Sequence, residues 1–336
     1  MLAIQVTKPG LDNLQLVERP IPEPRRGEVV MRVRAAALNY RDLEVIEGTY
    51  AIAYDVPLIP LSDAVGEIVA VSDEVRRVKI GDRVASTFWQ GWIDGAFETA
   101  DTTSSLGGPL DGVLAEYIRL SSEGVVRVPH HLSDEQAATL PCAAVTAWHA
   151  LVTDGHLAAG DSVLVEGSGS VSLFALQFAL LAGARVIATS SSKSKLERLL
   201  TLGAHATINY AETPMWGQEV RRLTSNRGVD HVIDVGGPES FQQALQAVRP
   251  GGQISIIGYL GGKTGSINPL EIFQQQATVR GTVRVGPRKS FEDMNRAITT
   301  SKLHPVVDKV FVWTEIRDAL NYMRMQQNFG KIVLAF

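Results

Sequence analysis

The chain has 336 residues, of which 45% are hydrophobic and 20% charged, and its net charge is -4. That length favours two domains, and the weak negative charge gives no electrostatic reason to bind nucleic acid or an anionic membrane. Neither a signal-peptide core nor an apolar run of membrane-spanning length occurs, so we expect a cytoplasmic protein. The single cysteine, Cys142, excludes an intrachain disulfide and any multi-thiolate metal cluster.

The first 125 or so residues predict a β-rich domain. Short, partly alternating runs at 28–35, 66–71 and 115–120 are separated by Pro and Gly turns. We therefore expect a compact antiparallel barrel in this part of the chain.

From about Ser133 onward, strands and helices alternate. Strands are expected near 162–166, 184–189, 229–235, 252–257 and 278–285, and Ser133 to Gln136 form a plausible capping box. This order is typical of an α/β Rossmann fold with a doubly wound parallel sheet. After Pro287 we expect a helix, a short strand near 309–312, another helix and a closing strand at 331–336. Because the parallel sheet is complete by then, this tail should return to the first domain. The predicted domains are 1–125 with 287–336, and 126–286.

The segment 161–172 predicts a buried strand that enters a tight turn of small residues. Gly167 would reverse the chain, Gly169 would let the backbone approach a pyrophosphate, and a helix starting near Ser170 and Val171 would direct its N–H groups at the anion. Ser172 takes the third glycine position of the fingerprint, which weakens it. An ordinary strand-turn-helix connection is the alternative.

No carboxylate follows the second parallel strand, where an acidic side chain would accept the ribose hydroxyls of NAD. The positions hold Ser190, Ser191 and Ser192, followed by Lys193 and Lys195. Hydroxyl groups and cations suit an additional phosphate, so NADP(H) is the predicted cofactor. In the alternative interpretation, Ser192 only caps the helix 193–202 and the cations are solvated.

Several motifs together resemble the medium-chain dehydrogenase/reductase superfamily, and within it the zinc-free quinone oxidoreductase branch. They are the segments 38–42, 81–84, 140–147 and 208–210, with the Gly167 turn. The resemblance implies a GroES-like catalytic domain beside the Rossmann domain, with the cofactor in the cleft between them. Members with catalytic zinc place ligands near Asn39, Tyr40, Ser62 and Asp63 and at Cys142. Only Cys142 is retained, so we expect no metal; the segment 92–112 also lacks the four cysteines of a structural zinc lobe.

Without zinc, a conjugated carbonyl or quinone is an easier hydride acceptor than an unactivated ketone. Asn39, Tyr40 and Tyr50 are the candidate catalytic donors, and Tyr50 resembles the proton-donating tyrosine of enoyl-thioester reductases. Alternatively, Tyr50 packs in its loop and Tyr40 fills the vacated ligand volume. The aromatic residues 88, 89 and 92 predict either an apolar substrate wall or a cover over the barrel end.

The resemblance and the strand ends together give the predicted cofactor-binding set. Thr146 would lie near the nicotinamide, and Lys331 belongs to a closing segment beside it. The full set is Thr146, Gly167, Gly169, Ser170, Val171, Ser190, Ser191, Lys195, Tyr210, Gly236, Ile257, Gly258, Tyr259, Val283 and Lys331.

The predicted function is NADPH-dependent reduction of quinones or α,β-unsaturated carbonyl compounds without zinc. A zinc-free alcohol dehydrogenase and an NADPH-binding protein with little turnover are the alternatives. The strand 278–285 would be an unprotected sheet edge, and the resemblance implies a homodimer formed there. No nucleic-acid or membrane partner is expected.

Overall fold

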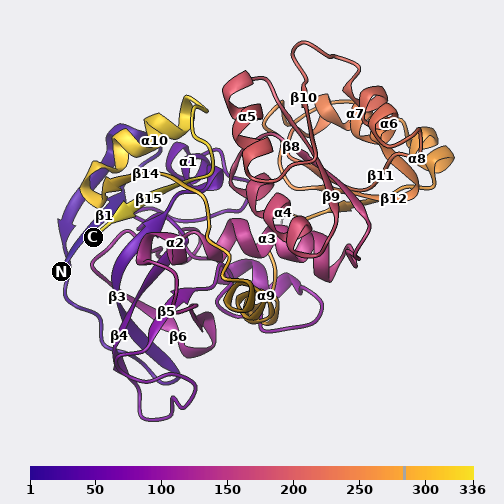
Figure 1. The fold of residues 1–336 in the computed structure, drawn as a ribbon. Helices are drawn as coiled ribbons and strands as arrows, with labels where there is room; N and C mark the ends of the chain where they lie inside the picture. Colours follow the sequence, from indigo (N-terminus) through magenta and orange to yellow (C-terminus); the bar gives the residue numbers. More distant parts are fainter. Residues whose placement is uncertain (283–284) are drawn as a thin grey trace. The chain divides into compact units, whose positions relative to one another are not determined.

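The computed structural model describes residues 1–282 and 285–336, which form two units (Figure 1). The discontinuous unit comprises Met1–Val145 and Gly286–Phe336, and the parallel-sheet unit comprises Thr146–Val285. The first boundary therefore follows Val145 rather than residue 125. The reason is that β7 (Val125–Arg127) pairs with β5 (Arg83–Ser86), and α2 (Asp134–Ala138) packs against the same sheet.

The discontinuous unit is built on a seven-stranded sheet. Its order is β14-β15-β3-β4-β5-β7, and β6 also pairs with β3. The remaining strand bounds are β3 (Glu28–Ala37), β4 (Asp63–Val71), β6 (Tyr117–Ser121), β14 (Val307–Val312) and β15 (Lys331–Ala335). Two further strands, β1 (Leu2–Val6) and β2 (Leu14–Glu18), form a separate antiparallel pair. The predicted strands of this domain are thus confirmed, within a few residues.

Alternating apolar side chains build the core of this unit. Met31 and Val33 on β3 pack with Ile68 on β4 and Ile118 on β6, whereas Arg32 between them is exposed. This period of two is what one face of a half-buried strand requires. Residues of the tail join the same core, including Leu334 of β15.

The tail returns to the first domain, as the sequence predicts. It consists of α9 (Arg288–Ser301), β14, α10 (Ile316–Arg324) and β15, and β15 pairs antiparallel with β3. The strand pairs within residues 1–127 are antiparallel, as expected, whereas β14 and β15 of the tail run parallel. A parallel pair needs a crossover, and α10 provides it.

The parallel-sheet unit has the strand order β10-β9-β8-β11-β12-β13, with every pair parallel. The order reverses between β8 and β11, which is where ligands bind in doubly wound folds. The bounds are β8 (Ser162–Glu166), β9 (Arg185–Ser190), β10 (Ala206–Asn209), β11 (Val229–Asp234), β12 (Val248–Ile256), β13 (Thr278–Gly281), α3 (Val145–Trp148, which begins at the unit boundary), α4 (Ser170–Leu181), α5 (Lys193–Thr201), α6 (Trp216–Leu223), α7 (Pro238–Ala247) and α8 (Pro269–Gln275). Strand β10 was not predicted, and β13 is shorter than expected.

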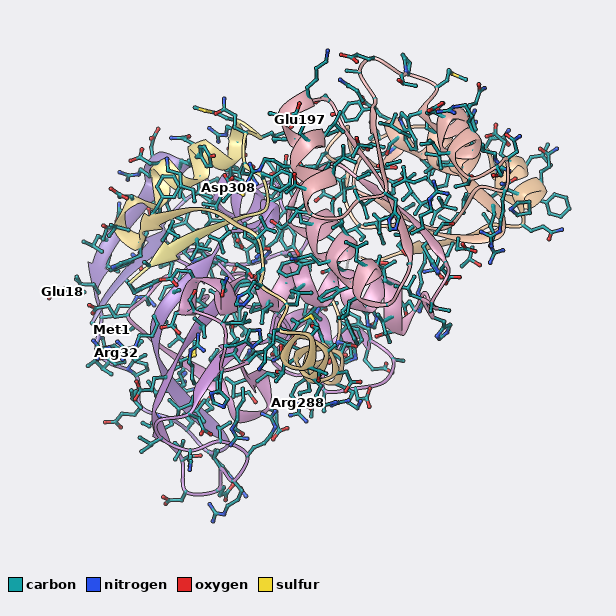
Figure 2. The ribbon with its side chains drawn as sticks, viewed as in Figure 1. Met1, Glu18, Arg32, Glu197, Arg288 and Asp308 are labelled. Carbon is teal, nitrogen blue, oxygen red and sulfur yellow. The ribbon has the colours of Figure 1, made fainter. Side chains whose placement is uncertain are left out.

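Charged side chains lie on helices of both units. In Figure 2, Glu197 projects from α5 in the parallel-sheet unit, and Arg288 lies at the start of α9 in the discontinuous unit. Across residues 1–282 and 285–336, no helix is both long and apolar enough to cross a membrane.

Candidate functional site

The turn after β8 has the backbone that the glycine fingerprint requires. Gly167 adopts a left-handed conformation with φ of 74°, and Gly169 is the N-cap of α4. A Cβ added at Gly169 would meet no atom of the described chain within 4 Å, so open space lies over the start of this helix. The first N–H groups of a helix and its dipole attract anions. Gly167, Gly169, Ser170 and Val171 are therefore arranged as a pyrophosphate site requires.

Ser172 joins α4 to β8. Its buried hydroxyl donates to the carbonyl oxygen of Glu166 at 2.6 Å. The side chain at the third fingerprint position is thus small enough for close packing, and it adds a hydrogen bond that glycine could not make. The turn is also held by Gly167, whose N–H donates to the Thr189 hydroxyl at 3.3 Å.

The structure brings the predicted 2′-phosphate residues to one edge of the sheet. Asn209 pairs with Ser190 in the β9–β10 register, so Tyr210 follows directly beside Ser190. Ser191 and Tyr210 are exposed, and Lys195 lies one turn into α5. Ser192 caps that helix by accepting from the Lys195 N–H, so its capping role is confirmed, whereas the 2′-phosphate site stays a prediction. Exposed groups at the carboxyl ends of parallel strands can accept a charged ligand.

Asp234 organises the loops after β11 and β12. Its Oδ1 accepts hydrogen bonds from the N–H groups of Gly236 at 3.0 Å and Gly237 at 2.9 Å and from the Ser240 hydroxyl at 2.9 Å. Its backbone oxygen accepts from Ile257 N–H at 2.8 Å. The predicted residues Gly236, Ile257, Gly258 and Tyr259 consequently lie close together, at the strand ends where ligands bind.

Glu166, the last residue of β8, forms a carboxyl pair with Asp234 on the neighbouring strand β11. Burial and the adjacent Asp234 raise the pKa of Glu166 well above its usual value, and burial also raises that of Asp234. Glu166 Oε1 and Asp234 Oδ2 are buried and have no protein partner among the described residues. Burial and the neighbouring carboxyl group thus favour the protonated form of Glu166. The pair lies at the point where the strand order reverses.

Two cofactor predictions concern the unit boundaries. Thr146 is buried in α3, between the π-helical turns Leu140–Ala144 and His149–Thr153. Val283 lies outside the described residues. The role of either residue in binding stays a prediction.

In the discontinuous unit, Asn39 begins α1 (Tyr40–Glu47). Its backbone N–H donates to Asp42 Oδ2 at 2.8 Å, which is one half of a capping box. Tyr40 is 45% exposed at the first helical position. Burial and, to a lesser extent, the neighbouring Asp63 raise the pKa of Asp42 to about 6, against a lowering by Arg41.

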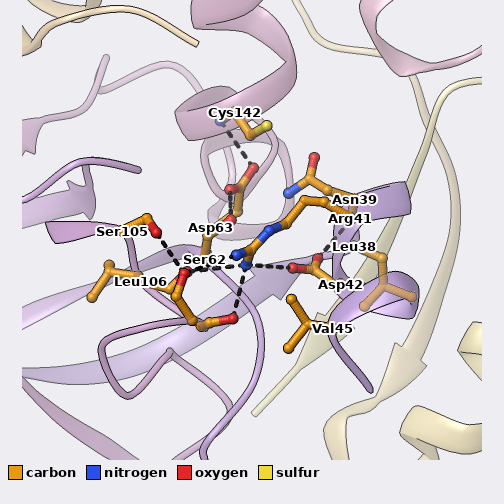
Figure 3. Close-up of polar contacts among 12 residues, drawn as sticks. Leu38, Asn39, Arg41, Asp42, Val45, Ser62, Asp63, Ser105, Leu106 and Cys142 are labelled. Atoms are coloured by element: carbon orange, nitrogen blue, oxygen red, sulfur yellow. Dashed lines mark hydrogen bonds and ion pairs between the residues drawn. The ribbon is translucent and has the colours of Figure 1, made fainter. Parts of the chain in front are cut away.

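Arg41 is buried beside this capping box (Figure 3). Its guanidinium donates to the carbonyl oxygens of Leu106, Gly107 and Gly108 at 3.0 to 3.2 Å and contacts Asp42 at 3.3 Å. It also lies over the ring of Tyr50, 4.7 Å from the centroid. Burial raises the pKa of Tyr50, and the Arg41 charge lowers it, so the phenol is neutral but faces a cation. Tyr50 packs against the core of this unit, as one interpretation expects, and its role as a proton donor stays a prediction.

Lys331 is completely buried among polar groups of the same unit. Its Nζ donates to the Leu38 carbonyl at 2.9 Å and to Asn39 Oδ1 at 2.7 Å, and it lies 3.5 Å from Asp63 Oδ2. Asp63 is also completely buried and accepts from the Ser62 hydroxyl at 2.7 Å and from the Cys142 N–H at 3.1 Å. We predicted that Lys331 contacts the cofactor. In the structure, its ammonium instead donates hydrogen bonds to acceptors of the discontinuous unit.

The positions that hold zinc ligands in relatives do converge here, but their side chains do not fit zinc. Asp63, the one carboxylate of the set, faces an ammonium, and Asn39 Oδ1 accepts from the same ammonium. Burial, and then the Asp63 charge, raise the pKa of the Cys142 thiol far above its usual range, so no thiolate forms readily. In the parts of the chain that the structure describes, no group of three or more His, Cys, Asp or Glu side chains is placed to hold a metal.

The three aromatic residues of segment 88–92 are buried against one another and Phe97. Trp89 meets Phe88 and Phe97 edge to face with centroids 4.9 Å apart, and Trp92 meets Phe97 in the same way. The rings thus form one packed cluster, and whether it borders a substrate or covers the barrel end stays a prediction.

Sequence reasoning missed two buried charge arrangements. Glu166 and Asp234 are each the last residue of a fully buried strand, and a carboxylate in such a place could have drawn attention. The Lys331–Asp63 contact joins residues 268 positions apart, and no local signal indicates it.

Comparisons with known proteins agree with this architecture. The alcohol dehydrogenase GroES-like domain model matches residues 25–130, and the zinc-binding dehydrogenase model matches residues 170–300. A zinc-type alcohol dehydrogenase-like protein of Schizosaccharomyces pombe is 41% identical over 97% of this chain and 96% of its own length. An acryloyl-coenzyme A reductase of Metallosphaera sedula is 30% identical over 98% of both chains. The solved structure of an NAD-dependent alcohol dehydrogenase is 34% identical, covers 100% of both chains and has a TM-score of 0.91.

Both domains and the motifs between them are thus found together in whole-length relatives. The chain belongs to the medium-chain dehydrogenase/reductase superfamily and is an oxidoreductase of that family, whose members bind a nicotinamide cofactor.

Proposed function

We propose that this protein is an NADPH-dependent reductase of α,β-unsaturated carbonyl compounds or quinones that works without zinc. The proposal rests mainly on one observation. The positions that hold zinc ligands in relatives carry side chains that do not fit zinc, and the buried ammonium of Lys331 lies among them. Lys331 occupies the acceptors of Asp63 and Asn39, so a Lewis acid has no ligand set there. A conjugated acceptor needs only donors at its oxygen and a proton source.

The residues of the parallel-sheet unit fit NADP(H). The open N-terminus of α4 would hold the pyrophosphate through the backbone of Gly169, Ser170 and Val171. Ser190, Ser191, Lys195 and Tyr210 would surround the 2′-phosphate. With serines at the positions where an NAD enzyme has a carboxylate, the chain offers hydroxyl donors there instead of a like charge that would repel the phosphate.

When bound, NADPH supplies a hydride to the electron-poor carbon of the acceptor, and the electron pair moves onto the carbonyl oxygen as an enolate. Asn39 Nδ2 would donate a hydrogen bond to that oxygen. The Tyr50 phenol would transfer its proton to the adjacent carbon, and Arg41, 4.7 Å from the ring centroid, would stabilise the phenolate until water reprotonates it. The raised pKa of Tyr50 keeps the proton on the phenol before the reaction.

The relatives include enzymes that agree with the proposed reaction and enzymes that favour a different one. The acryloyl-coenzyme A reductase acts on a conjugated carbonyl, as its name states, which agrees with the proposal. The NAD-dependent alcohol dehydrogenase favours a second candidate, carbonyl–alcohol interconversion with NAD(H). Both the coenzyme and the substrate class therefore have to be measured.

The decisive experiment follows the oxidation of NADPH by chelator-treated protein with 2-cyclohexenone and with 9,10-phenanthrenequinone. NADH is run in parallel, and 1-hexanol with NAD⁺ or NADP⁺ tests the second candidate. Chelator-insensitive turnover with NADPH supports the proposal. Turnover of the alcohol only, or turnover that needs added Zn²⁺, would reject it.

Two substitutions locate the chemistry. Tyr50→Phe keeps the ring over Arg41 but removes the proton, so enone reduction should fall by about a hundredfold while quinone reduction changes little. Lys195→Glu should raise the KM for NADPH by about tenfold or more and leave that for NADH nearly unchanged. An equal increase in the KM for NADPH and for NADH would argue against the 2′-phosphate site.

We also propose a homodimer formed along β13. This strand is the last of its sheet, and β12 is its neighbour on one side. The exposed side chains of Leu270 and Phe273 on α8 lie in the segment just before it. A monomeric mass in solution, measured by light scattering, would contradict this proposal.

A further inference from the structure

We propose that Lys331 is a positioning residue that fixes the side-chain amide of Asn39 so that its NH₂ group, rather than its oxygen, is presented to the substrate carbonyl. This inference rests on the proposed function, because it assigns the enolate-stabilising donor of that reaction. It gives Lys331 a role other than contact with the cofactor.

The ammonium of Lys331 has a fixed set of acceptors. An ammonium has three N–H bonds and accepts none, and here three acceptors surround it: the Leu38 carbonyl at 2.9 Å, Asn39 Oδ1 at 2.7 Å and Asp63 Oδ2 at 3.5 Å. The lysine side chain has 0% exposure, so it cannot turn outward to water. Its position is therefore determined by the fold of one unit.

The Asn39 amide has two ends of opposite polarity. In the observed orientation, Oδ1 accepts from the ammonium; in the flipped orientation, the NH₂ group would face a cation at the same distance. Burial strengthens this discrimination, because both groups are shielded from water. The capping box at the start of α1 also directs the Asn39 side-chain oxygen toward the Asp42 backbone, and the ammonium of Lys331 adds a charged donor that favours the same orientation.

The other end of the amide is a buried donor that lacks a protein acceptor. Asn39 Nδ2 has no hydrogen-bond partner among the described residues. A buried donor in that state costs free energy, and a substrate oxygen that gains negative charge would supply the missing acceptor. Figure 3 shows the amide of Asn39 beside Arg41 and across from Cys142, among the other polar side chains of this cluster.

The orientation of the amide can be read without any turnover. The protein is labelled with ¹⁵N in the asparagine side chains, and the Asn39 resonance is assigned by its loss in Asn39→Asp. We compare Asp63→Asn with Asp63→Asn/Lys331→Met, because removing the ammonium alone would leave the Asp63 charge buried. The proposal expects the Asn39 NH₂ signal to shift or broaden when Lys331 is replaced. An unchanged signal in a folded protein overturns it.

A kinetic cycle then tests the consequence for the reaction. Replacing Lys331 by Met in the Asp63→Asn background should lower kcat for 2-cyclohexenone by about tenfold or more, with the KM for NADPH changed by less than about twofold. With Asn39→Ala also present, the same lysine replacement should change kcat by less than about twofold, because the amide it positions is gone. The proposal would be overturned if the two replacements lowered kcat additively. It would also be overturned if the lysine replacement raised the KM for NADPH and left kcat unchanged.

The two sets of results separate this inference from the proposed function. If the wild-type protein reduces no conjugated carbonyl, the proposed function fails, whereas the NMR comparison still decides whether Lys331 orients the amide. If turnover is present but the amide signal and the kinetic cycle show no coupling, only the positioning role fails. Lys331→Arg in the native background, which retains a cation, should preserve the amide signal and thereby excludes a general packing effect.

Discussion

In the discontinuous unit the buried carboxylate of Asp63 faces the ammonium of Lys331, whereas in the parallel-sheet unit Glu166 faces a second carboxyl group, Asp234. The first arrangement keeps charges and neutralises them by pairing. The second removes a charge, because Glu166 holds a proton that burial and its neighbour make hard to release. The difference shows that a fold can bury a carboxylate by partnering it or by protonating it. The second solution makes stability fall as the pH rises above the usual pKa of a glutamate side chain.

The largest effect on stability is expected from breaking the ion pair between Lys331 and Asp63. Lys331→Met should lower the free energy of unfolding by about 3–5 kcal/mol, because Asp63 would remain as an uncompensated buried charge. Adding Asp63→Asn should recover much of that loss. Urea denaturation monitored by tryptophan fluorescence measures both variants, and a loss in the single variant that the second substitution does not reduce would contradict the pairing.

Glu166→Gln tests the protonated pair. The pKa of Glu166 is raised in the folded state, so its stabilising proton is fully bound below the unfolded value of 4.5 and is lost as pH rises through the folded value. Across that window, wild-type stability should fall by up to about 1.4 kcal/mol for each pH unit on account of this group. Gln retains the hydrogen bond without a titratable proton, so the variant should show a smaller slope in denaturation midpoints between pH 5 and 8.

The matched control for that slope is Glu212→Gln. Glu212 is exposed and contacts Lys193 at 3.2 Å, so its removal should leave the pH dependence unchanged. If both variants flatten the slope equally, the buried carboxyl pair is not its source.

A smaller effect is expected where the parallel-sheet unit uses a neutral hydrogen bond. Ser172→Ala removes the 2.6 Å bond to the Glu166 carbonyl and should cost about 1 kcal/mol of stability. Thermal unfolding at fixed pH provides the measurement. A substantially larger loss, accompanied by weaker NADPH binding, would mean that Ser172 also fixes the shape of the Gly167 turn.

The smallest effect on stability is expected at an exposed ion pair, which can be compared with the buried pair of Lys331 and Asp63. Lys193→Met breaks the Lys193–Glu212 contact, whose side chains are 77% and 59% exposed. Its cost should stay below about 0.5 kcal/mol and decrease further at high salt. An effect as large as that of Lys331→Met would show that burial does not determine the strength of these pairs.

Features that depend on neighbouring residues were accessible from the sequence. The Gly167 turn, the Ser133 capping box and most strands of both sheets follow from local periodicity and turn chemistry, and the structure confirms them; β5, β7 and β10 were not predicted. The missing carboxylate near Ser191 is likewise a local observation, although the coenzyme remains a prediction. The zinc-ligand comparison named Asn39, Asp63 and Cys142 correctly as neighbours in space, through the family pattern rather than through periodicity.

The buried charge contacts were not accessible, for a physical reason. Asp63 and Lys331 meet only because β15 joins the sheet beside β3, and nothing in the 331–336 segment specifies which strand it will pair with. Tyr50 presents a related difficulty, since its stacking on Arg41 depends on loop conformation, which spacing does not determine. The first domain boundary was misplaced for the same reason: α2 packs against a sheet whose strands are distant in sequence.

The pairing of β15 with β3 also imposes an order on synthesis. Lys331 lies 293 residues after Leu38, and the whole parallel-sheet unit is encoded between them. On the ribosome, Thr146–Val285 is therefore available to fold as one continuous segment while the sheet of the discontinuous unit still lacks its β15 strand. Until that strand emerges, Asp63 has no ammonium partner and should remain hydrated. The contacts of Lys331 with Asp63 and Asn39 therefore form only after the whole parallel-sheet unit has been synthesised.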